Sequence, residues 1–118
     1  MKKLAITALG LLVSLSTAGG APAAETATVT GHLRDGLCFT TMGAMGSTHR
    51  KCALACAKAG IAVMLVEDGT DKGYVLLPPK DKEGLPASVI NKIEDEVTVT
   101  GHPYTKNGIS YLQVESVK

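Results

Sequence analysis

Alternating residues predict β-strands near both ends of the chain. The stretch TATVTGHL, at 26–33, alternates small and β-branched residues as a half-buried strand does, and a turn is expected at 34–36. Near the other end, EVTVTGHPY from Glu96 and the later ISYLQVESV flank a turn around 106–108, which predicts a hairpin. The pentapeptide TVTGH occurs in both regions, and we treat it as a weak internal similarity rather than a repeat.

Between Gly46 and Gly60 the pattern changes to that of a helix. Ser47 or Thr48 can cap its start, HRKCALACAKA supplies good helix formers, and Gly60 ends it. The small and apolar residues of this segment fall on one stripe, which consists of Cys52, Ala53, Ala55, Cys56 and Ala59.

Three further elements are predicted between this helix and the last hairpin. The apolar run at 61–67, a turn at 68–71 and GYVLL at 73–77 form a hairpin pattern. A short helix follows at 86–93, with Pro86 in its first turn.

The predicted order is strand, helix, strand, strand, helix, strand, strand. Five strands with a helix between the third and fourth are the element order of an OB-type barrel. We therefore predict a mainly β protein, an OB-like five-stranded barrel with two short helices, in which residues 36–60 form a helical insertion between strands 1 and 2. An open sheet with two helices is the alternative.

The first 23 residues have the pattern of a secretory signal peptide. Lys2 and Lys3 precede an apolar or weakly polar run at 4–18, and Ala21-Pro22-Ala23 predicts cleavage before Ala24. A run of about fifteen residues is shorter than the roughly 20 that a spanning helix needs. We expect an exported protein, most simply a periplasmic one, with a single OB-like domain at 24–118 and no membrane association after cleavage.

The exported domain is small and nearly neutral. Removing 23 of 118 residues leaves 95, with 10 basic and 11 acidic side chains. No basic stripe is present to attract nucleic acid, and aromatic residues for base stacking are few. A nucleophile with a neighbouring base, a carboxylate pair and a phosphate-binding loop do not stand out either, so we predict that the protein is not an enzyme.

The stretch CFTTMGAMGSTHRKCALAC, at 38–56, contains all three cysteines. Spacings of three and four place His49, Cys52 and Cys56 on one face of the predicted helix. Cys38 belongs to the loop expected before that helix. Together they have the composition of a Cys₃His metal site.

Helix geometry argues against a disulfide between Cys52 and Cys56. Residues four apart hold their Cβ atoms roughly 5–6 Å apart, whereas a disulfide needs about 3.5–4.5 Å. The same two sulfurs can ligate one ion, because metal–sulfur bonds of about 2.3 Å keep them well separated. Thiolates favour copper or zinc, and the thioethers of Met42 and Met45 are additional candidate ligands that favour copper. Packing explains these methionines equally well.

Asp35 has two interpretations. It precedes Cys38 closely and can hydrogen-bond a ligand histidine from outside the metal's own coordination shell. It is also a common turn residue.

Two alternatives to a metal site remain open. In an oxidising compartment, Cys38 can bond to Cys52 or Cys56, which would stabilise the domain by about 3 kcal/mol and leave one thiol over. The protein would then be a disulfide-stapled module that docks another exported protein. Thiol exchange with a partner is the second alternative, although the chain contains no C-x-x-C pair.

The chain resembles small exported bacterial OB-fold-like domains. The resemblance covers residues 26–118 and rests on the strand order and on VTVTGH, NG and YLQVESV. A looser similarity to exported metal-binding proteins rests on G-x-x-x-D-x-x-C and H-R-x-C-A-x-x-C. These motifs consist here of Gly31, Asp35, Cys38, His49, Arg50, Cys52, Ala53 and Cys56. The second similarity implies that they include the residues of a metal site.

Two weaker signals concern other polar residues. His32 and His102 each follow a glycine at a predicted strand end, which suggests either a second metal site or partly exposed histidines at the barrel rim. The acidic run at 94–96 is expected to be an exposed turn.

Overall fold

The computed structural model describes residues 25–118. The predicted signal peptide at 1–23 and its cleavage point lie outside these residues. The elements follow one another as β1 Ala27–Asp35, α1 Gly36–Met42, the 3₁₀ turn η1 Ser47–His49, α2 Arg50–Lys58, β2 Val63–Glu67, β3 Gly73–Leu77, α3 Ala87–Ile90, β4 Glu96–Lys106 and β5 Ile109–Val117.

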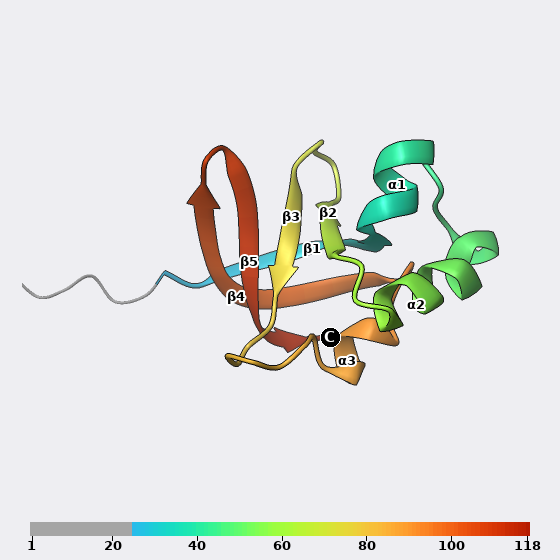
Figure 1. The fold of residues 1–118 in the computed structure, drawn as a ribbon. Coiled ribbons are helices and arrows are strands. Elements are labelled where there is room, and N and C mark those ends of the chain that lie inside the picture. The colour runs from blue at the N-terminus through green and yellow to red at the C-terminus, as the bar shows by residue number, and fades with distance from the viewer. Residues whose placement is uncertain (1–24) are drawn as a thin grey trace, which may run out of the picture.

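The five strands form a closed barrel in the order β1-β2-β3-β5-β4 (Figure 1). β1 pairs antiparallel with both β2 and β4, and only the β3–β5 pair is parallel. In the part of the chain that the structure describes, closure leaves no long unpaired sheet edge. The predicted mainly β fold is confirmed, the arrangement is consistent with an OB-like barrel, and the open-sheet alternative is wrong.

The barrel interior is filled by alternate residues of every strand, as the period of two requires. α2 and the segment around α3 complete this core with Ala53, Ala57, Val89 and Ile93. The buried strand residues are Val29, Leu33, Val63, Leu65, Tyr74, Leu76, Val97, Val99, Leu112 and Val114.

The two TVTGH segments lie side by side as antiparallel neighbours in β1 and β4. Their threonines pair through hydroxyl hydrogen bonds, Thr28 with Thr100 at 3.1 Å and Thr30 with Thr98 at 2.8 Å. Both segments need glycine for a different reason: a Cβ on Gly31 or on Gly101 would lie only 2.1 Å from a carbonyl oxygen of the adjacent strand. Each pentapeptide therefore supplies a paired threonine face and one site of close strand approach.

The predicted turn at 34–36 is wrong. β1 continues through Asp35, and α1 begins directly afterwards at Gly36, so Cys38 lies on a helix rather than in a loop. The Asp35 carboxylate accepts a hydrogen bond from the Cys38 N–H and caps this helix. An Asp-Gly pair is also common in turns, so the sequence pattern alone favoured a turn at this position.

Two helix boundaries also differ from the prediction. Ser47 and Thr48 do not cap α2 but belong to η1, and α2 starts after His49 without a side-chain cap. α3 is only one turn long, and Pro86 precedes it as the N-cap. Turns rather than helix follow α3 before β4 begins.

The insertion at 36–60 contains α1, η1 and α2, and it packs beside the end of β1 (Figure 1). Among residues 25–118, no helix has the length and apolar character needed to cross a membrane.

Candidate metal centre

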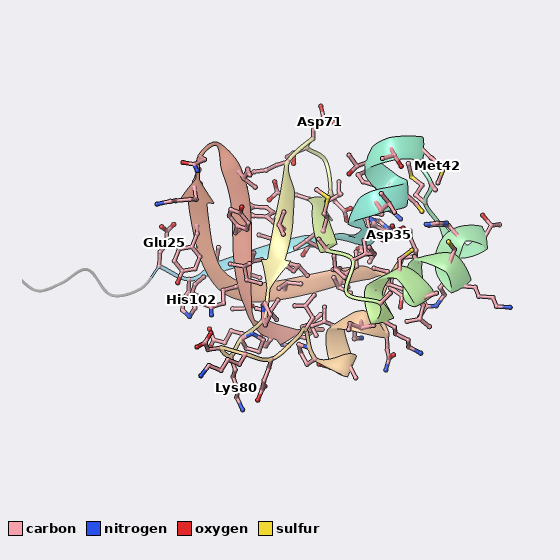
Figure 2. All side chains as sticks on the ribbon, viewed as in Figure 1. Glu25, Asp35, Met42, Asp71, Lys80 and His102 are labelled. Atoms are coloured by element: carbon pink, nitrogen blue, oxygen red, sulfur yellow. The ribbon has the colours of Figure 1, made fainter. Side chains whose placement is uncertain are left out.

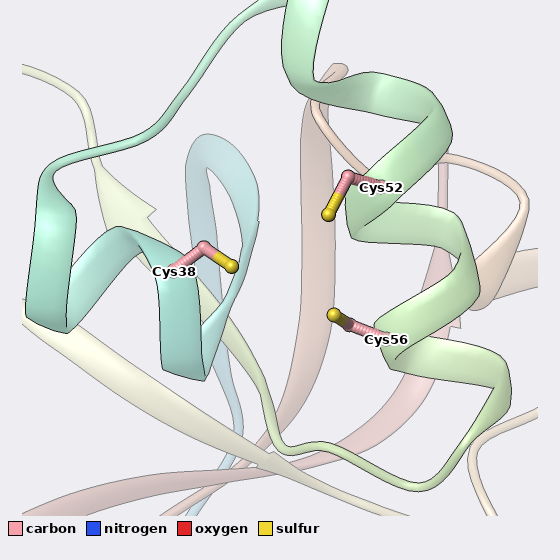
Figure 3. A group of neighbouring side chains, drawn as sticks. All are labelled: Cys38, Cys52 and Cys56. Atoms are coloured by element: carbon pink, nitrogen blue, oxygen red, sulfur yellow. The ribbon is translucent and has the colours of Figure 1, made fainter.

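The three cysteines face one another across the space between α1 and α2 (Figure 3). Cys38 lies on α1, and Cys52 and Cys56 lie one turn apart on α2. Their sulfur atoms are all within 4.8 Å of one another. All three are free cysteines, so the structure contains no disulfide staple within residues 25–118.

The spacing of the sulfurs suits a single ion. If all three sulfurs were 4.8 Å apart, the largest separation that the group has, a point at their centre would lie about 2.8 Å from each. A zinc–sulfur bond is about 2.3 Å long. An inward movement of about 0.5 Å or less at each sulfur, within the reach of a χ1 adjustment, would bring all three to bonding distance.

The three thiols differ in exposure. Cys38 is buried, Cys56 is partly buried and Cys52 is exposed. The pKa of the Cys38 thiol is raised to about 11, mainly by burial and in addition by the nearby Asp35 carboxylate and the other two cysteines. Burial also raises the pKa of Cys56, with the same carboxylate and Cys52 adding to it. In the metal-free protein these two thiols are therefore protonated at neutral pH.

Asp35 and His49 lie beside Cys38 and form a second group with it. The His49 Nε2 atom is 2.6 Å from the Asp35 Oδ2 atom. Asp35 is fully buried because the alternation of β1 points it inward, at the strand end that the insertion covers. No group within residues 25–118 joins His49 to all three cysteines at this distance, so Cys38 is the residue that the two groups share.

The Asp35 carboxylate is ionised in this setting. Burial alone would raise its pKa, but the hydrogen bonds from the Cys38 N–H and the His49 ring outweigh that effect and leave the pKa lowered. An ionised Asp35 orients the His49 ring by accepting a hydrogen bond from its Nε2–H group.

Met42 and Met45 do not serve as core packing residues. Met42 is 70% exposed at the end of α1, and Met45 is 52% exposed in the loop that leads to η1. Figure 2 shows Met42 at the loop end of α1, above Asp35.

A buried ion pair beside the site was missed by the sequence analysis. Arg34 on β1 pairs with Glu94, and the side chains of the two residues are only 11% and 1% exposed. The same carboxylate accepts a hydrogen bond from the Gly46 N–H at 2.8 Å. The expectation of an exposed acidic turn is therefore wrong for Glu94, because only the tertiary fold brings Arg34 and the insertion to it.

The two barrel histidines do not share a site. The His32 Nδ1 atom is 3.0 Å from Asp68, and with Glu96 these residues form an exposed group of potential ligands. The His102 Nδ1 atom is 2.8 Å from the Glu25 carbonyl oxygen. Both histidines are partly exposed. The expectation that each lies at a strand end is wrong, because β1 continues to Asp35 and β4 to Lys106.

A mainly apolar cavity of about 320 Å³ lies away from these groups. None of the three cysteines lines it. Its walls come from Ala57, Lys58, Gly60, Ile61, Ala62, Val63, Leu76, Pro78, Gly84, Leu85 and Ile90.

The Cys38, His49 and Asp35 group also has the residue types of a cysteine nucleophile with a base and an orienting carboxylate. Its environment does not suit that chemistry. A reactive cysteine is accessible and has a lowered pKa, whereas Cys38 is buried and its pKa is raised. The arrangement of Cys38 with Cys52 and Cys56 instead provides three sulfur atoms that point toward one another.

Comparison of the chain with known protein families, with curated proteins and with solved structures finds no match in any of the three. The functional inference therefore rests on the geometry of the site.

Proposed function

We propose that this protein binds a soft metal ion, copper or zinc, and acts in metal binding, buffering or transfer. The observation that carries the proposal is the convergence of the Cys38, Cys52 and Cys56 sulfurs to within 4.8 Å from two separate helices. Thiolate ligands select Cu(I) and Zn(II) over harder ions. Three thiolates satisfy the usual coordination of Cu(I), and they leave one tetrahedral position of Zn(II) to fill.

His49 is the proposed fourth ligand, with Asp35 as its orienting partner. Because the Nε2 atom of His49 is bonded to Asp35, the Nδ1 atom is the one that an ion would take. Ligand histidines commonly donate their other ring N–H to a carboxylate, which sets the tautomer and increases the basicity of the ligand nitrogen. Approach of the Nδ1 atom to the three sulfurs would join the two groups into one Cys₃His site.

Export supports the choice of metals and partners. The basic start and apolar run of residues 1–23 favour secretion, most simply to the periplasm. There the protein would act as a carrier rather than an enzyme, exchanging its ion with another exported protein and binding neither nucleic acid nor membrane. The periplasm favours oxidation of thiols. A bound ion would protect the three cysteines from it, because their sulfurs would be occupied as ligands.

The test is metal stoichiometry measured by native mass spectrometry on the reduced, purified protein. We expect one Zn(II) or one Cu(I) per chain, with the loss of about one proton for each thiol that ligates the ion. Cys38→Ser, Cys52→Ser and Cys56→Ser should each weaken binding, whereas His102→Ala, outside every group of potential ligands among residues 25–118, should leave it unchanged. Co(II) loading provides a second readout, because sulfur-to-cobalt charge-transfer absorption scales with the number of thiolate ligands.

The alternatives predict different outcomes. A disulfide-stapled module, purified in parallel without reductant, would be two hydrogen atoms lighter than the reduced chain and would bind no ion in that form. A thiol-exchange protein would reduce insulin at a rate that depends on a single cysteine. The raised pKa values of Cys38 and Cys56 disfavour such exchange at neutral pH, because the attacking species is the thiolate.

A further inference from the structure

We propose that Met42 and Met45 form an access point through which Cu(I), but not Zn(II), reaches the three cysteines. This inference rests on the proposed metal-binding function and names the ion that the site is built to acquire. It assigns the two methionines to loading of the site rather than to the final coordination shell.

The first support is their position relative to Cys38. Cys38 and Met42 are four residues apart on α1, and this spacing places them on one helical face. α1 ends at Gly43, which adopts the left-handed conformation with φ 67°. The chain then folds back, and the Ala44 N–H donates a hydrogen bond to the Cys38 carbonyl oxygen at 3.3 Å. The loop that carries Met45 is thus attached to the turn of helix that carries Cys38.

The second support is that this loop is held at its other end as well. The residue after Met45 is Gly46, whose N–H donates to the buried Glu94 carboxylate at 2.8 Å. Met45 therefore stands on a short segment, 43–46, that is hydrogen-bonded to α1 on one side and to the barrel on the other. An exposed thioether on such a segment is carried by a backbone that is held close to α1.

The third support is that the side chains of Met42 and Met45 are exposed to water rather than packed in the core. Leu37, Met42 and Met45 are three of the five large apolar side chains that are exposed among residues 25–118. Met64 on β2 provides the contrast, since it is only partly exposed and its Sδ atom lies 3.9 Å from the Thr40 hydroxyl. Two water-exposed thioethers within four residues of each other, at the end of the helix that carries Cys38 and in the loop after it, are suited to binding a soft ion.

The cysteine group is reached from solvent at one of its members. Cys52 is the exposed member of the group. It lies nearer than Cys56 to the end of α2 at which the connection from α1 arrives (Figure 3). We therefore take exposed Cys52 as the thiol that an incoming ion meets before the partly buried Cys56 and the buried Cys38.

The chemistry separates the two ions. A thioether is neutral and soft, so it binds Cu(I) without losing a proton and has little affinity for Zn(II). During transfer, each copper–thioether bond breaks as a copper–thiolate bond forms, and the proton of that thiol passes to solvent. The copper stays Cu(I) throughout, so no oxidant or reductant is required.

The experiment compares loading rates in Met42→Leu/Met45→Leu with those in the parent. Leucine keeps the apolar volume and removes only the sulfur, and Met64→Leu is the matched control. Cu(I) is supplied as its bathocuproine disulfonate complex under anaerobic conditions, and loss of that colour is followed by stopped flow. Zn(II) is supplied from a colorimetric zinc indicator. The two single variants and circular dichroism of each protein verify that folding is retained.

We expect the double variant to take up Cu(I) about tenfold more slowly or worse, a barrier increase of roughly 1.4 kcal/mol. Final stoichiometry and the rate of Zn(II) uptake should stay at the parent values, and Met64→Leu should change neither rate. Unchanged Cu(I) uptake by the double variant overturns this inference and leaves the cysteine site intact. Equal slowing of both ions overturns it too, because the cause would then be structural. A parent protein that takes up no Cu(I) refutes the access point, and one that takes up neither ion refutes the proposed function as well.

Discussion

Replacing Glu94 tests whether the buried ion pair holds the helical insertion to the barrel. Glu94→Gln keeps the shape of the side chain and an oxygen for the Gly46 N–H but removes the charge that faces Arg34. The Arg34 side chain is only 11% exposed, and its guanidinium also lies over the Phe39 ring, 5.9 Å from its centre. Its charge would then be buried without a partner.

The expected loss is large for a domain of this size. Removing one member of a buried pair costs about 3–5 kcal/mol, out of a total stability of about 5–15 kcal/mol for a small domain. Arg50 and Asp95 provide a matched control, because they form an arginine–carboxylate pair at 2.5 Å with side chains 40% and 49% exposed. Water screens that pair, so Asp95→Asn should cost less than about 1 kcal/mol.

The backbone at Glu94 makes the prediction sharper. Its φ is 69°, a left-handed conformation that costs a non-glycine residue about 1 kcal/mol or more. Glu94→Gly and Glu94→Ala remove the same carboxylate, but only glycine also relieves this strain. Glu94→Gly should therefore be the less destabilised of the two by about 1 kcal/mol.

Urea denaturation of the metal-free, reduced proteins at pH 7 measures these differences from the transition midpoint at constant m-value. A Glu94→Gln variant that loses no more stability than Asp95→Asn would show that the pair is not an anchor. Equal stability of the glycine and alanine variants would refute the strain argument.

Three further predictions concern the barrel and the site. Gly101→Ala should destabilise the protein by about 3 kcal/mol or more, because the added Cβ would lie 2.1 Å from a carbonyl oxygen of the adjacent strand. Gly84→Ala is the control, because a Cβ at Gly84 meets open space. Its stability should stay within about 0.5 kcal/mol of the parent in the same denaturation assay. Alkylation with iodoacetamide at pH 7, located by peptide mass spectrometry, should modify exposed Cys52 first and buried Cys38 last, since the pKa of Cys38 is raised to about 11; equal rates in the native protein would contradict the described burial. Because the pKa of Asp35 is lowered, its ionised form stabilises the fold above the ordinary carboxyl pKa, and this contribution is lost as the pH falls through the lowered pKa. In the metal-free protein, Asp35→Asn should therefore reduce the loss of stability with falling pH, measured by urea denaturation at a series of acidic pH values. An unchanged loss would refute the assignment.

Local patterns were sufficient for the barrel. Strand alternation depends on neighbours two residues apart, and the hairpin turns depend on residues adjacent in sequence, so five strands in the correct order could be read without knowing what they pack against. The convergence of Cys52 and Cys56 was equally accessible, because a spacing of four within one helix sets their relative direction.

Tertiary structure alone decided the rest of the site. Asp35 ends a strand and starts a helix because its inward-facing carboxylate finds the Cys38 N–H and the His49 ring, and an Asp-Gly pair does not reveal those partners. Glu94 is buried because Arg34, 60 residues earlier, neutralises it. A charge leaves water only when a partner is present in the fold, and the identity of that partner is a property of three-dimensional neighbours rather than of sequence spacing.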